Sequence, residues 1–250
     1  MKRDRIKIDL LIHDLKVPLA VIDAGISSLL KREEKYGPLT EKQKKVLMRA
    51  LRNTKITQAL VGDALEIGKS SEGILNPSRF TISDLVRQSL VEIFDLSNSN
   101  TSEKVKNCND LLELREVLEG DGLGLDVDER TWCEEVCLDE VKIRQILRNL
   151  LNNALKYRKS RVELSIEKKD DALFVSVKDD GEGIPSGYHE KIFQCYFQMN
   201  GEEACPVRGH GLGLAGVMVL VEDMGGKLYL ESAEGAGACF TVKVPLVSKR

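Results

Sequence analysis

The sequence has few of the features that define metal-binding, nucleic-acid-binding or secreted proteins. Its six cysteines are scattered without a CxxC pair and without a histidine-rich run beside them, so no zinc site is predicted. We interpret them as the reduced thiols of a cytosolic protein. The formal net charge of -3 leaves no electrostatic footprint for nucleic acid, and no nucleic-acid partner is expected.

Long hydrophobic runs are also missing. No apolar stretch reaches the length of a membrane span, and the charged start, Met1 to Arg5, leads into a helical pattern rather than a signal sequence. We therefore expect a cytoplasmic location and no membrane contact for this part of the chain. Because the helical pattern starts directly at the first residue, a longer, membrane-anchored parent with a sensor module stays open.

Length and composition favour two compact units. The 250 residues exceed one small domain, and 42% hydrophobic with 31% charged residues fits a soluble globular protein. The run Gly68–Gly73 marks a break, because regular helical periodicity ends there and mixed helix and strand patterns follow. We predict a helical hairpin at residues 1–70 and a second domain at residues 74–250.

The first unit carries a heptad pattern. Apolar residues recur at alternating steps of four and three, namely at Ile8, Ile12, Leu15, Leu19, Ile22, Ile26 and Leu29. The run Tyr36–Thr40 interrupts this helix, and Thr40 can cap a second one of similar spacing. Since two helices cannot enclose a core, the pattern predicts a homodimer in which two hairpins form a four-helix bundle.

The second unit has the pattern of an α/β sandwich. Alternating apolar residues at 162–166 and 173–177 predict an antiparallel hairpin, with further strands at 228–232 and 240–245. Helical patterns at 83–94, 139–157 and 212–224 predict helices on one face of that sheet. The predicted fold class is therefore α+β, a helical hairpin followed by this sandwich.

The stretch Ser97–Arg130 is harder to assign. It holds a possible helix at Asp110–Glu119 and a glycine loop at Gly120–Leu125. Because Asp121 and Asp126 flank that loop without a nearby basic residue, we interpret it as a connection and not as a phosphate site.

Two motifs carry polar groups suited to a nucleotide. The run Asn149–Tyr157 ends an amphipathic helix, and the carboxamide oxygen of Asn153 is a hard neutral ligand of the kind that Mg²⁺ takes beside phosphates. The alternative is that these asparagines cap the helix or face solvent. The run Asp179–Pro185 follows a strand; its carboxylate could accept from an adenine amino group, although a generic acidic turn is the alternative.

Two further motifs follow along the chain. The run Gly209–Ala215 enters a helix, so its glycines and the helix N-terminus could wrap phosphates, although glycine-rich helix starts also serve packing. The run Ile192–Phe197 is interpreted as packing that positions the segment Gln198–Arg208, which has the pattern of a lid.

These four motifs, in their order along the chain, resemble the N, G1, F and G2 boxes of the two-component sensor histidine kinases. Upstream, Ile12–Leu19 resembles the H box of that family, and Gly225–Phe240 resembles its closing strands. The resemblance covers nearly the whole chain apart from Ser97–Arg130. It implies a dimerisation and phosphoacceptor hairpin, a GHKL (Bergerat) ATP-binding domain shared with gyrase, MutL and Hsp90, and a response-regulator receiver domain as partner.

The resemblance also assigns roles to residues. It implies ATP and Mg²⁺ as cofactors, His13 and Asp14 as the catalytic pair, and Asn153 as the metal ligand. Arg208 is added because a lid cation could offset charge at the phosphates, the alternative being a solvated surface charge. The nucleotide-binding positions are Asn149, Asn153, Lys156, Tyr157, Asp179, Gly181, Gly183, Arg208, Gly209, Gly211, Leu212 and Gly213.

Two positions refine the expected activity. ATP hydrolases of the superfamily place a glutamate four residues before the metal-binding asparagine, whereas Asn149 stands here and cannot take a proton from water. Many relatives carry threonine or asparagine four residues after the phosphoacceptor, where Val17 stands here. The expectation is a kinase that phosphorylates His13 and then a regulator aspartate, with weak phosphatase activity.

Three alternatives stay open. A nucleotide-gated dimeric scaffold, or pseudokinase, would bind ATP only to change how partners are held. An ATPase would need the base that Asn149 lacks, and a serine kinase would not need the pair His13 and Asp14 on a dimer hairpin.

Overall fold

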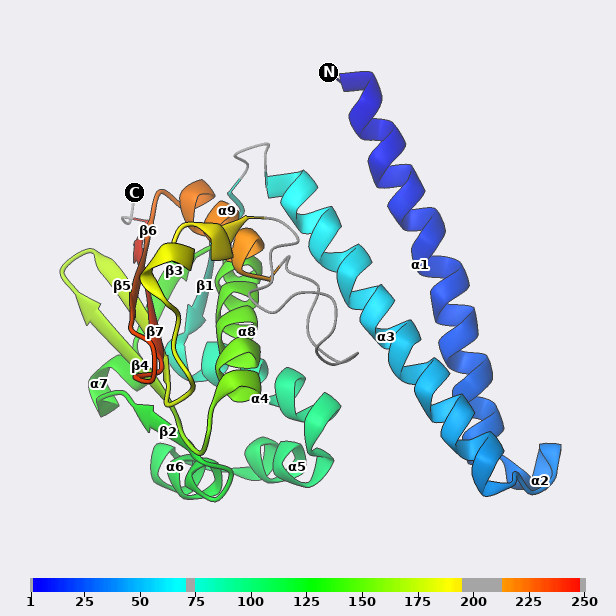
Figure 1. Cartoon of the computed structure of the whole chain (residues 1–250). Coiled ribbons are helices and arrows are strands. Elements are labelled where there is room, and N and C mark those ends of the chain that lie inside the picture. Colours follow the sequence, from blue (N-terminus) through cyan, green and yellow to red (C-terminus); the bar gives the residue numbers. More distant parts are fainter. Residues whose placement is uncertain (1, 71–74, 195–212, 248–250) are drawn as a thin grey trace. The chain divides into compact units, whose positions relative to one another are not determined.

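The computed structural model describes residues 2–70, 75–194 and 213–247 (Figure 1). In the first helices it describes only part of the side chains, and those of residues 2–14 lie outside the description. The chain divides into two compact units, Met1–Lys69 and Ser70–Arg250, and each is described by itself.

The first unit is a helical hairpin. Helix α1 spans Lys2–Lys31 and continues through Pro18; the short helix α2 spans Glu33–Tyr36, and α3 spans Glu41–Ser70. Thr40 and Gln43 form a capping box, because the Gln43 N–H donates to Thr40 Oγ1 at 3.3 Å and the Thr40 N–H donates to Gln43 Oε1 at 2.8 Å. The predicted hairpin and its cap are confirmed.

The hairpin exposes large apolar side chains, and two of them, Leu15 and Ile22, belong to the predicted stripe of α1. Large apolar side chains on both helices are at least 40% exposed, namely Leu15, Val17, Val21, Ile22, Val46 and Met48. An apolar helix face of this kind is stable in water only when another surface covers it.

The second unit is built on a five-stranded sheet with the order β2-β4-β5-β7-β6. The strands are β2 (Leu123–Asp126), β4 (Val162–Lys169), β5 (Ala172–Asp179), β6 (Lys227–Ser232) and β7 (Ala238–Pro245). All neighbours are antiparallel except β2 and β4, which are parallel. Asp170 has φ of 51° in the turn between β4 and β5, where the sequence predicted a hairpin.

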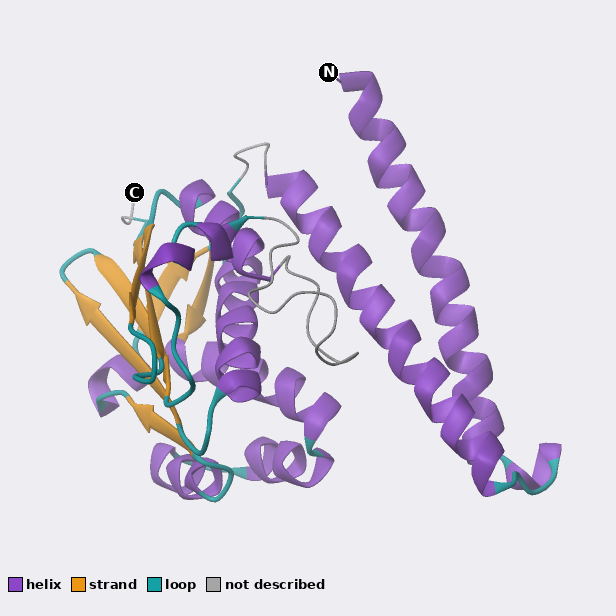
Figure 2. Ribbon diagram, viewed as in Figure 1, coloured by secondary structure: helices purple, strands orange, loops and turns teal. Residues whose placement is uncertain are grey.

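Helices cover one face of this sheet. Along β4 the side chains of Val162, Leu164 and Ile166 are buried, whereas those of Glu163 and Glu167 are exposed, so the alternation separates a core face from a solvent face. The long helices α4 (Ile82–Ser97), α8 (Glu140–Tyr157) and α9 (Gly213–Asp223) supply the other half of the core (Figure 2). The predicted sandwich is confirmed.

Three strands and two helices of the second unit were not predicted, namely β1, β2, β3, α5 and α7. Strands β1 (Ser78–Thr81) and β3 (Glu135–Leu138) form a separate antiparallel pair. Helix α5 (Ser99–Asn107) precedes the expected helix, which is α6 (Leu111–Glu119), and α7 (Glu129–Cys133) follows. The turns η1 (Ser186–Tyr188) and η2 (Lys191–Phe193) follow β5.

The interpretation of Gly120–Leu125 as a connection is wrong for its second half, because Leu123, Gly124 and Leu125 lie in the edge strand β2. Both leucines are buried, and Gly124 is buried against the Arg161 guanidinium, where an added Cβ would lie 3.0 Å from a guanidinium nitrogen. A glycine at the outward position removes the alternation of apolar and polar residues that normally indicates a strand.

Among the described residues, no helix combines the length and the apolar content needed to cross a membrane.

Helix α8 provides a test of the core. Leu147 is 0% exposed, whereas Val141 on the same helix is 59% exposed. We expect Leu147→Ala to lower the free energy of unfolding of the second unit by about 2–5 kcal/mol, because it leaves a cavity. We expect Val141→Ala to stay within about 0.5 kcal/mol of the parent. Chemical denaturation of the two variants measures both, and equal effects would contradict the assigned face.

Candidate functional site

Helix α8 positions two carboxamides on one face. Asn149 and Asn153 are one turn apart and half-buried, while Ile146, Leu147 and Leu150 on the neighbouring face are buried in the core. Burial of this apolar face fixes the rotation of the helix, and with it the direction of both asparagines.

Both carboxamides lie at the start of α9. Asn149 Nδ2 donates to the Gly213 carbonyl oxygen at 3.5 Å, and a Cβ added to Gly213 would lie 4.0 Å from Asn153 Nδ2. The N-terminal end of α9, where the positive end of the helix dipole lies, is thus bordered by two uncharged carboxamides.

The end of β5 supplies a carboxylate. Asp179 is 7% exposed, and the Gly181 N–H donates to its Oδ1 at 2.9 Å. A Cβ on Gly181 would collide with the Tyr157 carbonyl oxygen at the end of α8. Only a glycine therefore allows the loop after β5 to lie against the last turn of the helix that carries the carboxamides.

The pKa values of the neighbouring residues Asp179 and Asp180 are shifted in opposite directions. Burial raises the pKa of Asp179, although the N–H groups of Gly181 and Ala238 oppose this, and the charge of Asp180 raises it further. The pKa of Asp180 is held far below its usual range by the Ser160 hydroxyl, which donates at 2.5 Å, and by the N–H groups of Ser160, Arg161 and Lys159. Asp180 therefore stabilises the turn before β4, whereas Asp179 is a buried, incompletely compensated acceptor.

A second loop packs against this one. The Ser232 hydroxyl accepts from the Ile184 N–H at 2.8 Å and donates to the Gly237 carbonyl oxygen at 2.6 Å. Gly183 has φ of 73° and Gly237 has φ of 76°, and a Cβ on either would collide with a carbonyl oxygen of the facing segment. Ser232 and Gly237 were not predicted as residues of the site. The signal for them in the sequence was the pair of glycines between the last two strands.

The other predicted residues are distributed over three places. Lys156 and Tyr157 lie at the exposed end of α8, with the lysine Nζ 4.7 Å from the tyrosine ring centroid. His13 and Asp14 lie in α1 of the first unit. Four positions lie outside the described residues, namely Arg208, Gly209, Gly211 and Leu212.

The motif interpreted as packing has that role in its described part. Ile192 is 7% exposed, and the Phe193 ring lies edge-on to Phe240 at 6.4 Å between centroids with an interplanar angle of 88°.

The side chains of the candidate site limit which metal ion it can hold. The described residues contain no group of three or more His, Cys, Asp or Glu side chains that could hold a metal ion. Asn153 can supply one carboxamide oxygen. This fits a hard cation that keeps several waters and takes its other ligands from phosphates, and it does not fit a cation that needs an all-protein cage.

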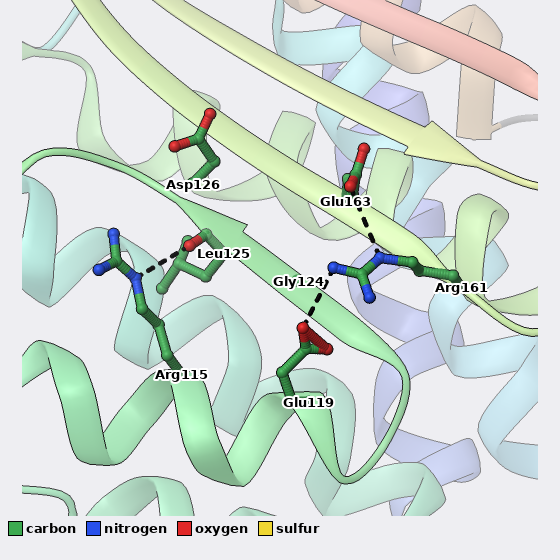
Figure 3. A pocket seen from close by; sticks show the side chains of 7 residues that line it. All are labelled: Arg115, Glu119, Gly124, Leu125, Asp126, Arg161 and Glu163. Carbon is green, nitrogen blue, oxygen red and sulfur yellow. Dashed lines mark hydrogen bonds and ion pairs between the residues drawn. The ribbon is translucent and has the colours of Figure 1, made fainter.

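A separate pocket lies at the β2 edge (Figure 3), lined by Arg115, Glu119, Gly124, Leu125, Asp126, Arg161 and Glu163. Arg161 pairs with Glu119 at 3.1 Å and with Glu163 at 3.5 Å, and Arg115 Nε donates to the Leu125 carbonyl oxygen at 3.1 Å. With a volume of about 160 Å³, it is smaller than the ~300–1,000 Å³ of most ligand sites. The contacts of Arg161 and Arg115 in this pocket stabilise the fold.

Comparison with known proteins finds similar sequences for both the second unit and the longer chain. Residues 138–248 match the family of histidine kinase-, DNA gyrase B- and HSP90-like ATPases. The chain is 30% identical over 237 residues to the circadian input-output histidine kinase CikA of Synechococcus elongatus, covering 93% of this chain and 29% of CikA. It is 29% identical over 244 residues to the adaptive-response sensory kinase SasA of Crocosphaera subtropica, covering 95% of this chain and 58% of SasA.

Solved structures agree on the fold. Full-length ShkA in complex with AMPPNP has a TM-score of 0.67 at 23% identity, covering 97% of this chain and 46% of ShkA. The histidine kinase AdeS of Acinetobacter baumannii has a TM-score of 0.58 at 19% identity, covering 94% of this chain and 98% of AdeS. The chain spans only 29% and 58% of the two curated relatives named above.

The raised pKa of Asp179 gives a test of stability against pH. The folded state disfavours the ionised carboxylate, so Asp179 costs stability as the pH rises through its folded pKa and costs nothing well below its ordinary value. We expect Asp179→Asn, which keeps an oxygen for the Gly181 N–H, to melt at a higher temperature than the parent at pH 7.5.

The difference should shrink towards pH 4, because protonation removes the same charge from the parent. Thermal unfolding followed by circular dichroism over this range measures it. Asp180→Asn is the control with the opposite sign, since it removes a carboxylate that the fold stabilises. A lower melting temperature of Asp179→Asn at every pH would contradict the assignment.

Proposed function

We propose that this chain, which carries a domain of the histidine kinase, DNA gyrase B and HSP90-like ATPase family and has relatives named histidine kinases, is the catalytic core of a sensor histidine kinase. Residues 74–250 bind ATP, and residues 1–70 provide the dimer and the phosphoacceptor. The reaction phosphorylates His13, and the phosphoryl group then passes to an aspartate of a response-regulator receiver domain.

The observation that carries the proposal is the buried Asp179, joined through Gly181 to the helix that bears Asn149 and Asn153. Within residues 75–194 and 213–247 no cation pairs with Asp179. A buried carboxylate of this kind is costly and fits a specific donor such as the adenine amino group. The AMPPNP bound by ShkA supports an adenine nucleotide as the ligand.

The phosphates would lie at the start of α9. There Gly213 begins the helix and the two asparagines border it. Of the remaining positions, Lys156 and Tyr157 border the site from the end of α8, and Gly209, Gly211, Leu212 and Arg208 would complete the phosphate loop and its lid. Mg²⁺ bound at Asn153 would neutralise charge on the phosphates.

The chemistry follows from residue types. One imidazole nitrogen of His13 attacks the γ-phosphorus, the new N–P bond forms, and the bond to the bridging oxygen breaks to release ADP. Asp14 accepts the proton from the other ring nitrogen, so the histidine stays nucleophilic. Asn149 cannot activate water, which favours transfer over hydrolysis.

Dimerisation follows from the first unit. The stripe of α1 is exposed at Leu15 (43%) and Ile22 (47%), and a second hairpin of the same periodicity supplies a covering surface.

The phosphoacceptor is tested with γ-labelled ATP and Mg²⁺. We expect the parent to take up label that survives alkali and is lost in acid, and His13→Gln to take up none. His189→Gln is a matched control, because His189 Nε2 donates to the Ile184 carbonyl oxygen at 2.9 Å and a Gln amide can replace that contact. It should keep the label. Nucleotide binding without label in the parent would favour the scaffold alternative, and label in His13→Gln would mean another acceptor.

Val17 tests the phosphatase expectation. Its side chain is 54% exposed on α1 but cannot hold a water for attack on a phosphoaspartate. We expect the parent to leave dephosphorylation of a cognate regulator at the buffer rate, and Val17→Thr to accelerate it. Val21→Thr, one turn further on the same helix and 67% exposed, should not. Fast dephosphorylation by the parent that disappears when Val17 is changed would refute this expectation.

A further inference from the structure

Asp139 has a contact that the proposed reaction does not explain. It is the N-cap of α8, and its Oδ1 accepts from the Lys142 N–H at 3.1 Å, which is the ordinary role of an N-cap. Its second oxygen, Oδ2, accepts from the backbone N–H of Asn76 at 3.0 Å. The residue is 5% exposed, so a buried carboxylate is shared between the helix and a segment 63 residues earlier in the sequence.

The segment that contains Asn76 connects the two compact units. The first unit ends at Lys69, and β1 begins at Ser78, where it pairs with Leu138 directly before Asp139. The Asn76 contact therefore extends the attachment of this connection by two residues beyond the β1–β3 ladder. It fixes the connection to the first turn of α8 and not only to the sheet.

Helix α8 carries that attachment to the candidate nucleotide site. Asn149 follows Asp139 by ten residues, or about 15 Å at about 1.5 Å per residue. The helix between them is held by Ile143, Ile146 and Leu147, each 0% exposed.

Helix α9 is tied to α8 at both ends. At the connection end, Lys142 Nζ and Asp223 Oδ2 are 2.9 Å apart, with side chains 13% and 14% exposed. At the other end Asn149 donates to Gly213. Since α8 and α9 are joined at two points and packed on one core, they move as a pair when the first turn of α8 is displaced.

We propose that Asp139 is a positioning residue that couples the connection at Asn76 to the nucleotide site through the α8–α9 pair. This rests on the proposed function. The contact sets where the connection leaves the second unit, and so how precisely the bound nucleotide can be presented to His13, without contributing to nucleotide binding. Precise presentation of two reactants governs the rate of a transfer more than the affinity for either.

Two variants remove the contact from opposite sides. Asp139→Ser keeps one hydroxyl oxygen for the Lys142 N–H, and serine is a good N-cap, but one oxygen on a shorter side chain cannot also reach Asn76. Asn76→Pro removes the N–H and leaves Asp139 unchanged. Each has a control: Asp110→Ser changes the N-cap of α6, which accepts from Glu113 at 2.9 Å, and Asn76→Ala keeps the N–H.

The full chain is assayed for the rate of His13 phosphorylation at increasing ATP. We expect both contact-breaking variants to lower the maximal rate about tenfold, the lower end of what one hydrogen bond to a charged group can change. The KM for ATP and the affinity for a non-hydrolysable ATP analogue should stay within about twofold of the parent. The double variant should be no slower than the single ones, and both controls should match the parent.

Three results would overturn the proposal: unchanged maximal rates, a rise in KM that accounts for the loss, or an equal loss in Asp110→Ser. If the parent takes up no label, that result contradicts the proposed function, and the Asp139–Asn76 contact is decided by a second measurement. Amide hydrogen exchange then decides, because the Asn76 N–H should be protected in the parent and in Asn76→Ala, and should exchange faster in Asp139→Ser. Equal exchange in all three would show that the contact is absent.

Discussion

The burial of one face of α8 is the constraint on which the candidate site depends. Its apolar side chains fix the rotation and the axial position of the helix, and the polar residues at both ends are placed as a consequence. Asp139 lies at one end; Asn149, Asn153 and the Tyr157 carbonyl lie towards the other. These groups lie on or against one packed helix, so a loss of packing beneath α8 would displace all of them together.

Local electrostatics distinguish two adjacent carboxylates, Asp179 and Asp180. Asp180 receives a hydroxyl and several N–H groups, so its charge is stabilised by the turn. Asp179 lies deeper, and its charge is compensated only in part. A protein gains no stability from such a group, which is why buried carboxylates of this kind are usually explained by a ligand.

Much of this arrangement could be predicted from the sequence. The heptad of the first unit, the β4–β5 hairpin and the helix that bears Asn149 and Asn153 have strong periodic patterns, because each has one face in water and one in a core. Strand β2 did not, since Gly124 occupies its outward position under Arg161. The strands β1 and β3 are four residues long, too short for a periodic signal. Ser232 and Gly237 act across sequence distances that no local pattern records.

The guanidinium of Arg115 has a consequence for association. It donates from the side of α6 to the carbonyl oxygens of Leu125 and Val127, at 3.1 Å and 2.6 Å. The Leu125 oxygen lies on the outer rim of β2 and the Val127 oxygen directly after the strand, and both are acceptors that an added strand from another molecule would need. Because a side chain of the same chain already occupies them, growth of the sheet by strand addition is blocked at this rim. Association through the strands of the second unit is thereby disfavoured at this edge.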